Sequence, residues 1–178
     1  MKIHKFICLC LYYGLARFLP PSHKNIFGLV GGEVRLYCAR HLFKYCAHNA
    51  NIEHMASFGD GHDIELGSRS CIGIHCNVPN DIKIGDDVMM GPHCYVLENV
   101  THCHNRIDIP MIFQGSKKVE TRTIIGNDVW MGRQCIMISG KTIGNHCIIG
   151  AGSVICKNIP DWKVAGGSPI RIIRDRRE

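Results

Sequence analysis

An aliphatic residue recurs at every sixth position over two long stretches of this 178-residue chain. The recurrence forms two runs, separated by an interruption: Leu66, Ile72, Val78, Ile84, Met90 and Val96, and then Ile125, Met131, Met137, Ile143, Ile149 and Ile155. A weaker trace precedes both runs at Ile52, Phe58 and Ile64, and a glycine often follows the aliphatic residue, as at Gly67 and Gly126. A repeat at a fixed short period is typical of a solenoid.

A period of six excludes an amphipathic helix, because 3.6 residues per turn would scatter these positions around the helix. A second small or branched residue follows four positions after most of the aliphatic ones: Ser70, Cys76, Ile82, Val88, Cys94, Val129, Cys135, Cys147, Ser153 and Ile159. We therefore predict a stack of coils in which three short strands close each coil and the aliphatic side chains point inward. The glycine would allow turn angles that a Cβ opposes.

The composition agrees with packing by small side chains, because aromatic residues make up only 7% of the chain and 19 residues are glycine. Several of the eleven cysteines lie at the second repeat position, including Cys76 and Cys147. We interpret them as reduced core residues of a cytoplasmic protein. The net charge of +6 suits an anionic small molecule, and we find no aromatic and basic strip of the kind that binds nucleic acids.

The N-terminal segment from Phe6 to Leu19 is apolar, carries Arg17 and ends at Pro20-Pro21. It is shorter than the roughly 20 apolar residues that a membrane-spanning helix needs. We expect a helix that packs against the body of the protein. Peripheral contact between this segment and a membrane stays open.

The repeat, with the stretches 125–174 and 101–115, resembles the hexapeptide-repeat acyltransferases, in particular the maltose, galactoside and capsular-polysaccharide O-acetyltransferase branch. The likeness runs from about Ile52 to the C-terminus. It implies an all-β fold, a left-handed parallel β-helix, with an N-terminal helical segment and a short C-terminal helix. We expect a helical cap over residues 1–45, the β-helix over 46–160 with an extruded loop over 98–122, and a C-terminal tail or helix over 161–178. Gly166-Gly167-Ser168-Pro169 would redirect the chain into that tail.

The interruption contains the candidate general base. In the family this loop reaches toward a neighbouring subunit, and its pattern of a histidine, an arginine and Asp-Ile-Pro-Met matches 102–111 without a gap. The resemblance therefore assigns catalysis to His102. His104 is an alternative, because residues two apart in an extended segment point the same way. A neutral imidazole suits the removal of a hydroxyl proton during attack on a thioester.

The resemblance also implies an acetyl-CoA site between subunits of a homotrimer. Its matching positions are Arg133, Ala151, Cys156, Lys157, Arg171 and Arg174. Arginine suits phosphate because its planar fork donates two parallel hydrogen bonds. Arg133 stands where the family commonly has a small residue, and Cys156-Lys157 replaces the usual Thr-Lys.

We expect transfer of an acetyl group to a hydroxyl of a sugar or polysaccharide precursor, with Asn77 and Asn80 as candidate acceptor-binding residues. Several alternatives stay open: N-acylation of an amino sugar or another amine, a longer acyl donor, a zinc enzyme of the carbonic anhydrase type, and a non-catalytic scaffold. No paired ligand spacing predicts a metal site, although His75, His93 and His146 fall on coils. We therefore expect no metal.

Overall fold

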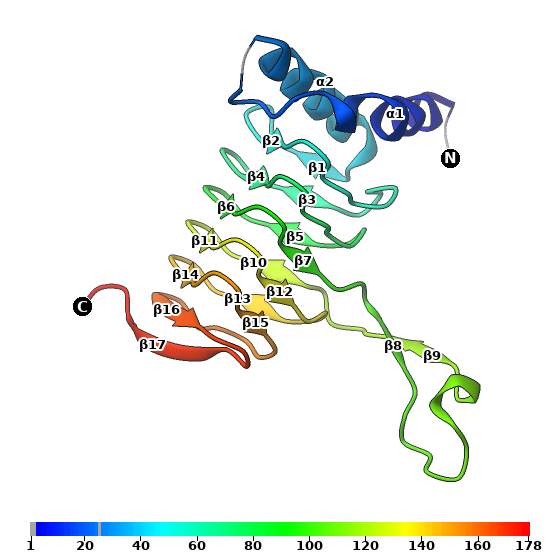
Figure 1. The fold of residues 1–178 in the computed structure, drawn as a ribbon, viewed down its shortest axis with the longest axis vertical. Coiled ribbons are helices and arrows are strands. Elements are labelled where there is room, and N and C mark those ends of the chain that lie inside the picture. Colours follow the sequence, from blue (N-terminus) through cyan, green and yellow to red (C-terminus); the bar gives the residue numbers. More distant parts are fainter. Residues whose placement is uncertain (1–2, 25) are drawn as a thin grey trace.

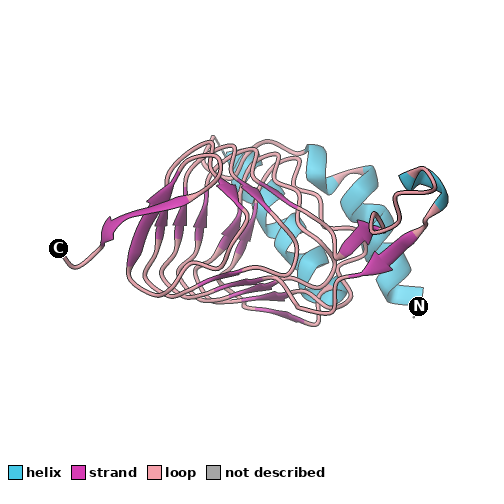
Figure 2. Ribbon diagram, turned by 90° about the horizontal axis from the view of Figure 1, so that it is seen from below, coloured by secondary structure: helices cyan, strands magenta, loops and turns pink. Residues whose placement is uncertain are grey.

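The computed structural model describes residues 3–24 and 26–178, and most of them wind into a parallel β-solenoid with an N-terminal helical segment (Figure 1). Each coil contributes one rung to each of three faces. Ile124 pairs with Thr142, three six-residue units further along the chain. The coils run from the helices at one end to a hairpin at the other, and strands of successive coils lie in layers (Figure 2). The predicted solenoid is confirmed, and its left hand is carried over from the resemblance.

The strands are short and fall on the three faces in rotation. Face 1 contains β1 (Tyr45–Cys46), β3 (Glu65–Leu66), β5 (Lys83–Ile84), β10 (Ile124–Ile125) and β13 (Thr142–Ile143). Face 2 contains β2 (Asn51–Ile52), β4 (Cys71–Ile72), β6 (Met89–Met90), β11 (Trp130–Met131), β14 (Ile148–Ile149) and β16 (Lys163–Gly166). Face 3 contains β7 (Tyr95–Val96), β12 (Ile136–Met137) and β15 (Val154–Ile155).

The core is built as the repeat predicts. All twelve aliphatic residues of the two runs are buried, and so are the small or branched residues four positions later. Cysteine and serine are equivalent at this second position: Ser70 Oγ donates to the carbonyl of Gly85 at 2.6 Å, and Cys76 Sγ donates to that of Gly91 at 3.1 Å. Ile64 leaves the six-count, because the first coil is two residues longer and Tyr45 pairs with Glu65.

The glycines have a different role from the one that we predicted. The left-handed backbone angles fall on the third residue after the aliphatic one, where the chain uses residues such as His75, Asp87 and Gln134. The glycine directly after the aliphatic residue instead makes room for the next coil. A Cβ at Gly126 would lie 2.8 Å from the carbonyl carbon of Gly144. Close approach of coils, rather than backbone angle, therefore selects glycine there.

Two helices cover the N-terminal end of the solenoid, α1 (Ile3–Gly14) and α2 (Ile26–Leu42), and a short helix η1 (Ala16–Phe18) follows α1. Tyr12 donates its buried hydroxyl to the carbonyl of Ala56 at 3.0 Å. Arg35 is wholly buried and donates to the carbonyls of Ile52 at 2.7 Å and Leu19 at 3.0 Å. In the described ranges, no helix has both the length and the apolar content needed to cross a bilayer.

The C-terminal segment corrects the prediction of a short helix. The chain reverses at the predicted Gly-Gly-Ser-Pro turn, and β17 (Arg171–Asp175) then pairs antiparallel with β16. The physical reason is the open edge of face 2, which presents unpaired backbone groups after the last coil. A strand satisfies these groups, whereas a helix would leave them exposed.

Candidate active site

An arm leaves the solenoid between β7 and β10 and is the most prominent interruption of the coils (Figure 1). Its stem is an antiparallel ribbon of β8 (Val100–His102) and β9 (Ser116–Lys118), and its tip contains the short helix η2 (Met111–Phe113). The arm arises at the corner between face 3 and face 1, which we call corner 3/1. The solenoid period cannot continue here, because the inserted residues lack the aliphatic repeat.

The stem fixes the position of His102. This residue is the last of β8, is exposed, and lies opposite Ser116 in the ribbon. Alternate residues of a strand point to the same side, so His102 leaves β8 on the side of Val100. His104 lies beyond the strand, and its Nδ1 is 3.1 Å from the carbonyl oxygen of His102. The stem therefore orders His102, whereas His104 sits on the irregular part of the arm.

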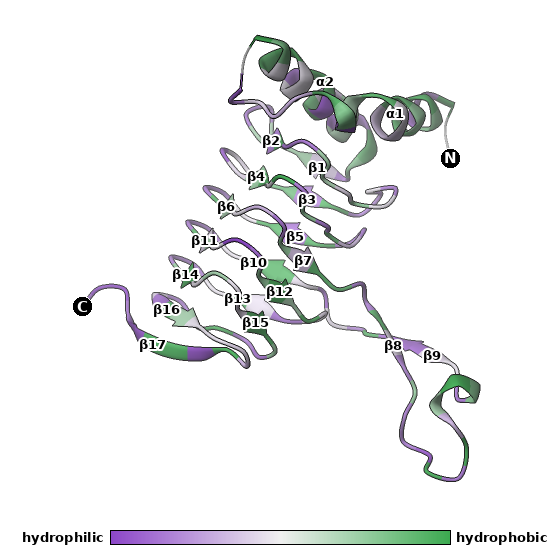
Figure 3. Ribbon diagram, in the orientation of Figure 1, coloured by the Kyte–Doolittle hydropathy of each residue, from purple (hydrophilic) through white to green (hydrophobic). Residues whose placement is uncertain are grey.

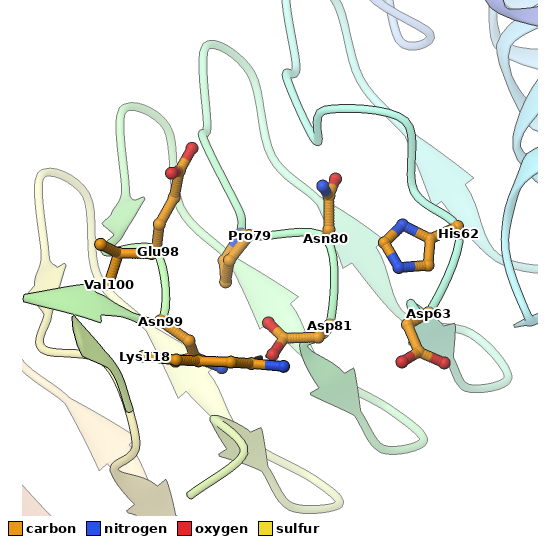
Figure 4. Close-up of a pocket in the computed structure, with 9 residues that line it drawn as sticks. All are labelled: His62, Asp63, Pro79, Asn80, Asp81, Glu98, Asn99, Val100 and Lys118. Carbon is orange, nitrogen blue, oxygen red and sulfur yellow. Dashed lines mark hydrogen bonds between the residues drawn. The ribbon is translucent and has the colours of Figure 1, made fainter. Parts of the chain in front are cut away.

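A polar pocket of about 330 Å³ borders the base of the stem (Figure 4). Its lining comes from three successive coils and from the stem: His62, Asp63, Pro79, Asn80, Asp81, Glu98, Asn99, Val100 and Lys118. The pocket combines carboxylates, amides, an imidazole and an ammonium group, which are donors and acceptors suited to a polyhydroxylated molecule. Val100, which lines the pocket, lies two residues before His102 in the sequence.

Of the two asparagines singled out in the sequence, the structure brings one to the pocket. Asn80 lines it, and the Asn80 Oδ1 accepts hydrogen bonds from the backbone N–H groups of Asp60 at 3.1 Å and Gly61 at 3.3 Å. Asn77 lies on face 3, where it forms isolated bridges with Ser57 and Tyr95. It does not line the pocket.

Sequence reasoning missed the residues that anchor the arm. Asn99 is buried, and its Nδ2 donates a short hydrogen bond to Asp81. Arg122, at the return of the arm, donates through Nε to the carbonyl of Asp81 at 2.6 Å and through Nη1 to Glu65 at 3.0 Å. Its ion pair contributes to holding the pKa of the Glu65 carboxyl below its ordinary value. The sequence does contain a signal for this anchoring, because Asn99 and Arg122 flank the interruption of the repeat.

The candidate coenzyme positions fall at two corners of the last coils. Arg133 and Ala151 are exposed at the corner between face 2 and face 3, which we call corner 2/3. Cys156 and Lys157 are exposed across face 3, on corner 3/1 below the arm. The surface is open at one point of corner 2/3, where a Cβ at Gly152 would meet nothing within 4 Å.

The candidate arginines of the tail, Arg171 and Arg174, differ from neighbouring cations, which pair with Asp175. Asp175 accepts hydrogen bonds from Lys163 Nζ at 2.8 Å and from Arg177 Nε at 2.9 Å. These partners, Arg177 first, hold the pKa of the Asp175 carboxyl far below its ordinary value. Arg171 and Arg174 are exposed on β17 and have no carboxylate partner among residues 3–24 and 26–178. They are therefore the tail cations that can meet a phosphate.

Of the three histidines considered as zinc ligands, the structure brings His75 and His93 together and places His146 on another corner. His75 and His93 stack at 4.9 Å between ring centroids on corner 2/3, next to His54. His146 lies on the corner between face 1 and face 2, where its ring stacks on Trp162 at 4.0 Å. Within the described part of the chain, no three His, Cys, Asp or Glu side chains form a cluster able to hold a metal ion.

A solenoid with a period of six residues, a histidine-bearing arm and a basic tail is the arrangement that the resemblance to the hexapeptide-repeat acyltransferases implies. Comparison with known proteins agrees. The model of the hexapeptide repeat of succinyl-transferase matches residues 122–157. An acetyltransferase of Saccharomyces cerevisiae is 32% identical over 138 residues, which cover 76% of this chain and 67% of that protein. The galactoside O-acetyltransferase of Escherichia coli is 29% identical over 145 residues, covering 80% and 69% of the two chains.

The solved structure of a galactoside acetyltransferase in complex with coenzyme A superposes with a TM-score of 0.75 at 26% identity, over 99% of this chain and 84% of that one. Some relatives are longer, and the chain spans 39% of an acetyltransferase of Mycobacterium tuberculosis that is 33% identical over 124 residues. The chain belongs to the hexapeptide-repeat acyltransferase family.

Proposed function

We propose that the chain transfers an acetyl group from acetyl-CoA to a hydroxyl of a sugar-like acceptor, with His102 as general base. The observation that carries this proposal is the position of His102, which a regular ribbon holds two residues from the rim of a polar pocket. The coenzyme A complex of the galactoside acetyltransferase supports the donor, and the name of the E. coli relative supports a sugar hydroxyl as acceptor.

The chemistry follows from these groups. His102 removes the proton of the acceptor hydroxyl as its oxygen attacks the thioester carbonyl. The tetrahedral oxyanion is stabilised by a hydrogen-bond donor, for which backbone N–H groups of the coil turns are candidates. The C–S bond then breaks, and the leaving thiolate takes the proton from the imidazolium. No covalent acyl-enzyme is needed, so the buried cysteines have no role as nucleophiles.

We also propose that the active unit is a parallel homotrimer. The arm and the pocket lie on corner 3/1, whereas Arg133 and Ala151 lie on corner 2/3, so one chain does not gather both sets. The tip of the arm supports contact with a neighbour, because Ile112 and Phe113 are exposed there. Within the trimer, corner 3/1 of one chain would meet corner 2/3 of the next.

Along the axis of the solenoid, the arm and Ala151 are close enough for one extended acetyl-CoA molecule to reach both. The arm leaves the third coil and Ala151 lies in the fifth, and coils in a β-sheet stack are about 4.8 Å apart, which gives a separation of roughly 10 Å. Ala151, Cys156 and Lys157 would hold the pantetheine arm, and Arg133, Arg171 and Arg174 would hold the phosphates. We infer a cytoplasmic location from the supply of acetyl-CoA and from the many cysteines.

The test is release of thiol from acetyl-CoA, measured against a panel of sugars and nucleotide sugars with an amino sugar included. We expect acceptor-dependent release by the wild type and its loss in His102→Ala. Release of thiol at the wild-type rate by this variant would reject the assignment of the base. Release only with the amino sugar would favour N-acylation.

A further inference from the structure

The helical cap carries an apolar outer surface that the proposed acetyl transfer does not use. Six apolar side chains are exposed just after α1, on η1 and at the start of α2, and we call them the apolar bend: Leu15, Phe18, Ile26, Phe27, Leu29 and Val30. Ile26 and Phe27 are 70% and 71% exposed. Ile3, Phe6 and Ile7 at the start of α1 are exposed as well. A short segment with this many exposed apolar residues points to an interaction surface.

Packing of the helices fixes which side chains of the apolar bend are exposed. The start of α2 packs closely on the segment after η1, since a Cβ at Gly31 would lie 2.8 Å from the Cβ of Leu19. The inner sides of both helices pack on the first coils through buried residues such as Tyr12 and Leu36. The exposed residues therefore cannot turn inward. The hydropathy colouring shows apolar residues along both helices, with polar ones between them on α2 (Figure 3).

The positive charge of the cap favours an anionic partner. Residues 1–44 contain seven lysines and arginines but one acidic residue, Glu33, whereas residues 45–178 contain fourteen of each sign. By sequence the net charge of +6 therefore lies in residues 1–44, although Arg35 is buried there and Lys44 pairs with Glu65 at 3.0 Å. Lys24 and Arg40 are exposed on it, and Arg17 stacks over the rings of Tyr13 and Phe18 at 5.3 and 5.5 Å. An anionic lipid surface attracts the basic side chains by charge and offers an apolar layer to the exposed apolar side chains.

We propose that the helical cap docks on the surface of an anionic lipid bilayer, with the apolar bend inserted at the level of the headgroups. Short helices with apolar and basic side chains lie in this way in the plane of a membrane. In the parallel trimer proposed above, three caps would face the same way and bind together, which strengthens the contact without a new interaction. The solenoid would then stand away from the membrane, with the arm further from it than the cap.

The test is sedimentation of the full chain with vesicles of phosphatidylcholine and phosphatidylglycerol, compared with vesicles of phosphatidylcholine alone. We expect binding at least ten-fold tighter to the anionic vesicles, weakened by added salt. The double variant Phe27→Ser, Val30→Ser and the single variant Lys24→Glu should each weaken binding, the double variant by at least ten-fold. These side chains are exposed, so an unchanged melting temperature checks that the fold is retained.

Matched controls separate docking from general stickiness. Ile107→Ser removes an exposed apolar side chain from the arm, and Lys83→Glu reverses an exposed charge on face 1; both should bind vesicles as the wild type does. Absence of binding to anionic vesicles, or equal loss in the controls, would overturn the proposal. A doubling of the mass in light scattering that Phe27→Ser, Val30→Ser abolishes would assign the cap to a second copy instead. Because the readout is binding, it does not depend on acetyl transfer.

Discussion

His102 lies directly opposite Ser116 in the antiparallel ribbon of β8 and β9. This register places His102 at the end of β8, two residues after Val100, which lines the polar pocket. His104, two residues on, contacts the carbonyl of His102 with its own ring. The ribbon therefore orders His102 but not His104, although the sequence pattern allows either residue to be the general base.

Replacing His102 by alanine should therefore lower kcat by about 10²- to 10⁴-fold, which is the usual contribution of a general base. The KM for acetyl-CoA should change little, because the proposed contacts to the coenzyme come from Ala151, Lys157 and the tail arginines rather than from His102. Steady-state kinetics with the best acceptor of the panel give both values. His104→Ala is the matched control and should keep most of the activity; the opposite ranking of the two variants would exchange their roles.

Asn80→Ala should raise the KM for the acceptor by roughly ten-fold, since a lost hydrogen bond to a neutral group is worth about 1 kcal/mol. Asn77→Ala is the control, because Asn77 does not line the pocket. Asn80 also caps the loop at Asp60, so the melting temperature must be measured with the kinetics. Equal effects of the two variants on KM would contradict an acceptor site at this pocket.

The double variant Arg171→Ala, Arg174→Ala should weaken binding of coenzyme A by about 10- to 100-fold, because hydrogen bonds to charged groups contribute about 1.5–3 kcal/mol. Isothermal calorimetry measures the dissociation constant without an acceptor. Arg69→Ala is the control. Arg69 is an exposed arginine that pairs with Asp87, away from the proposed coenzyme site, and its removal should leave the affinity for coenzyme A unchanged. Unaltered affinity in the double variant would remove the tail from the coenzyme site.

The sequence predicts the periodic parts of this molecule far better than the irregular ones. The inward positions follow from the period of six, because each coil repeats the same environment and the pattern is read many times. The strand β17 could not be predicted in this way, since it occurs once and forms only because the last coil leaves an open edge. The pocket was also hidden, because Asp81, Glu98 and Lys118 meet only after the coils stack.

The stacking of glycines also gives a prediction for stability. Gly126→Ala should destabilise the fold by about 1–3 kcal/mol, the usual cost of overpacking, because its Cβ would lie 2.8 Å from the carbonyl carbon of Gly144. Gly14→Ala is the control: a Cβ there would meet nothing within 4 Å, and alanine favours a helix. Denaturant unfolding compares the two. A stable Gly126→Ala would mean that neighbouring coils can move apart without loss.

Asp175 gives the last prediction, on the dependence of stability on pH. Its pKa is lowered in the folded chain, first by the hydrogen bonds from Arg177 and then by that from Lys163. A group with a depressed folded pKa stabilises the fold above its unfolded value, which is about 3.9 for an aspartate, and this contribution is lost as the pH falls toward the folded pKa.

Asp175→Asn should therefore melt at a lower temperature than the wild type at pH 7, and the difference should persist down to about pH 5 and shrink in more acid solution. Because Asp175 joins β17 to β16, the variant should also loosen the strand that carries Arg171 and Arg174, and its affinity for coenzyme A should fall with its melting temperature. Scanning calorimetry from pH 3 to pH 7 measures the difference. A difference that is constant over this whole range would show that the charge of Asp175 does not hold the hairpin.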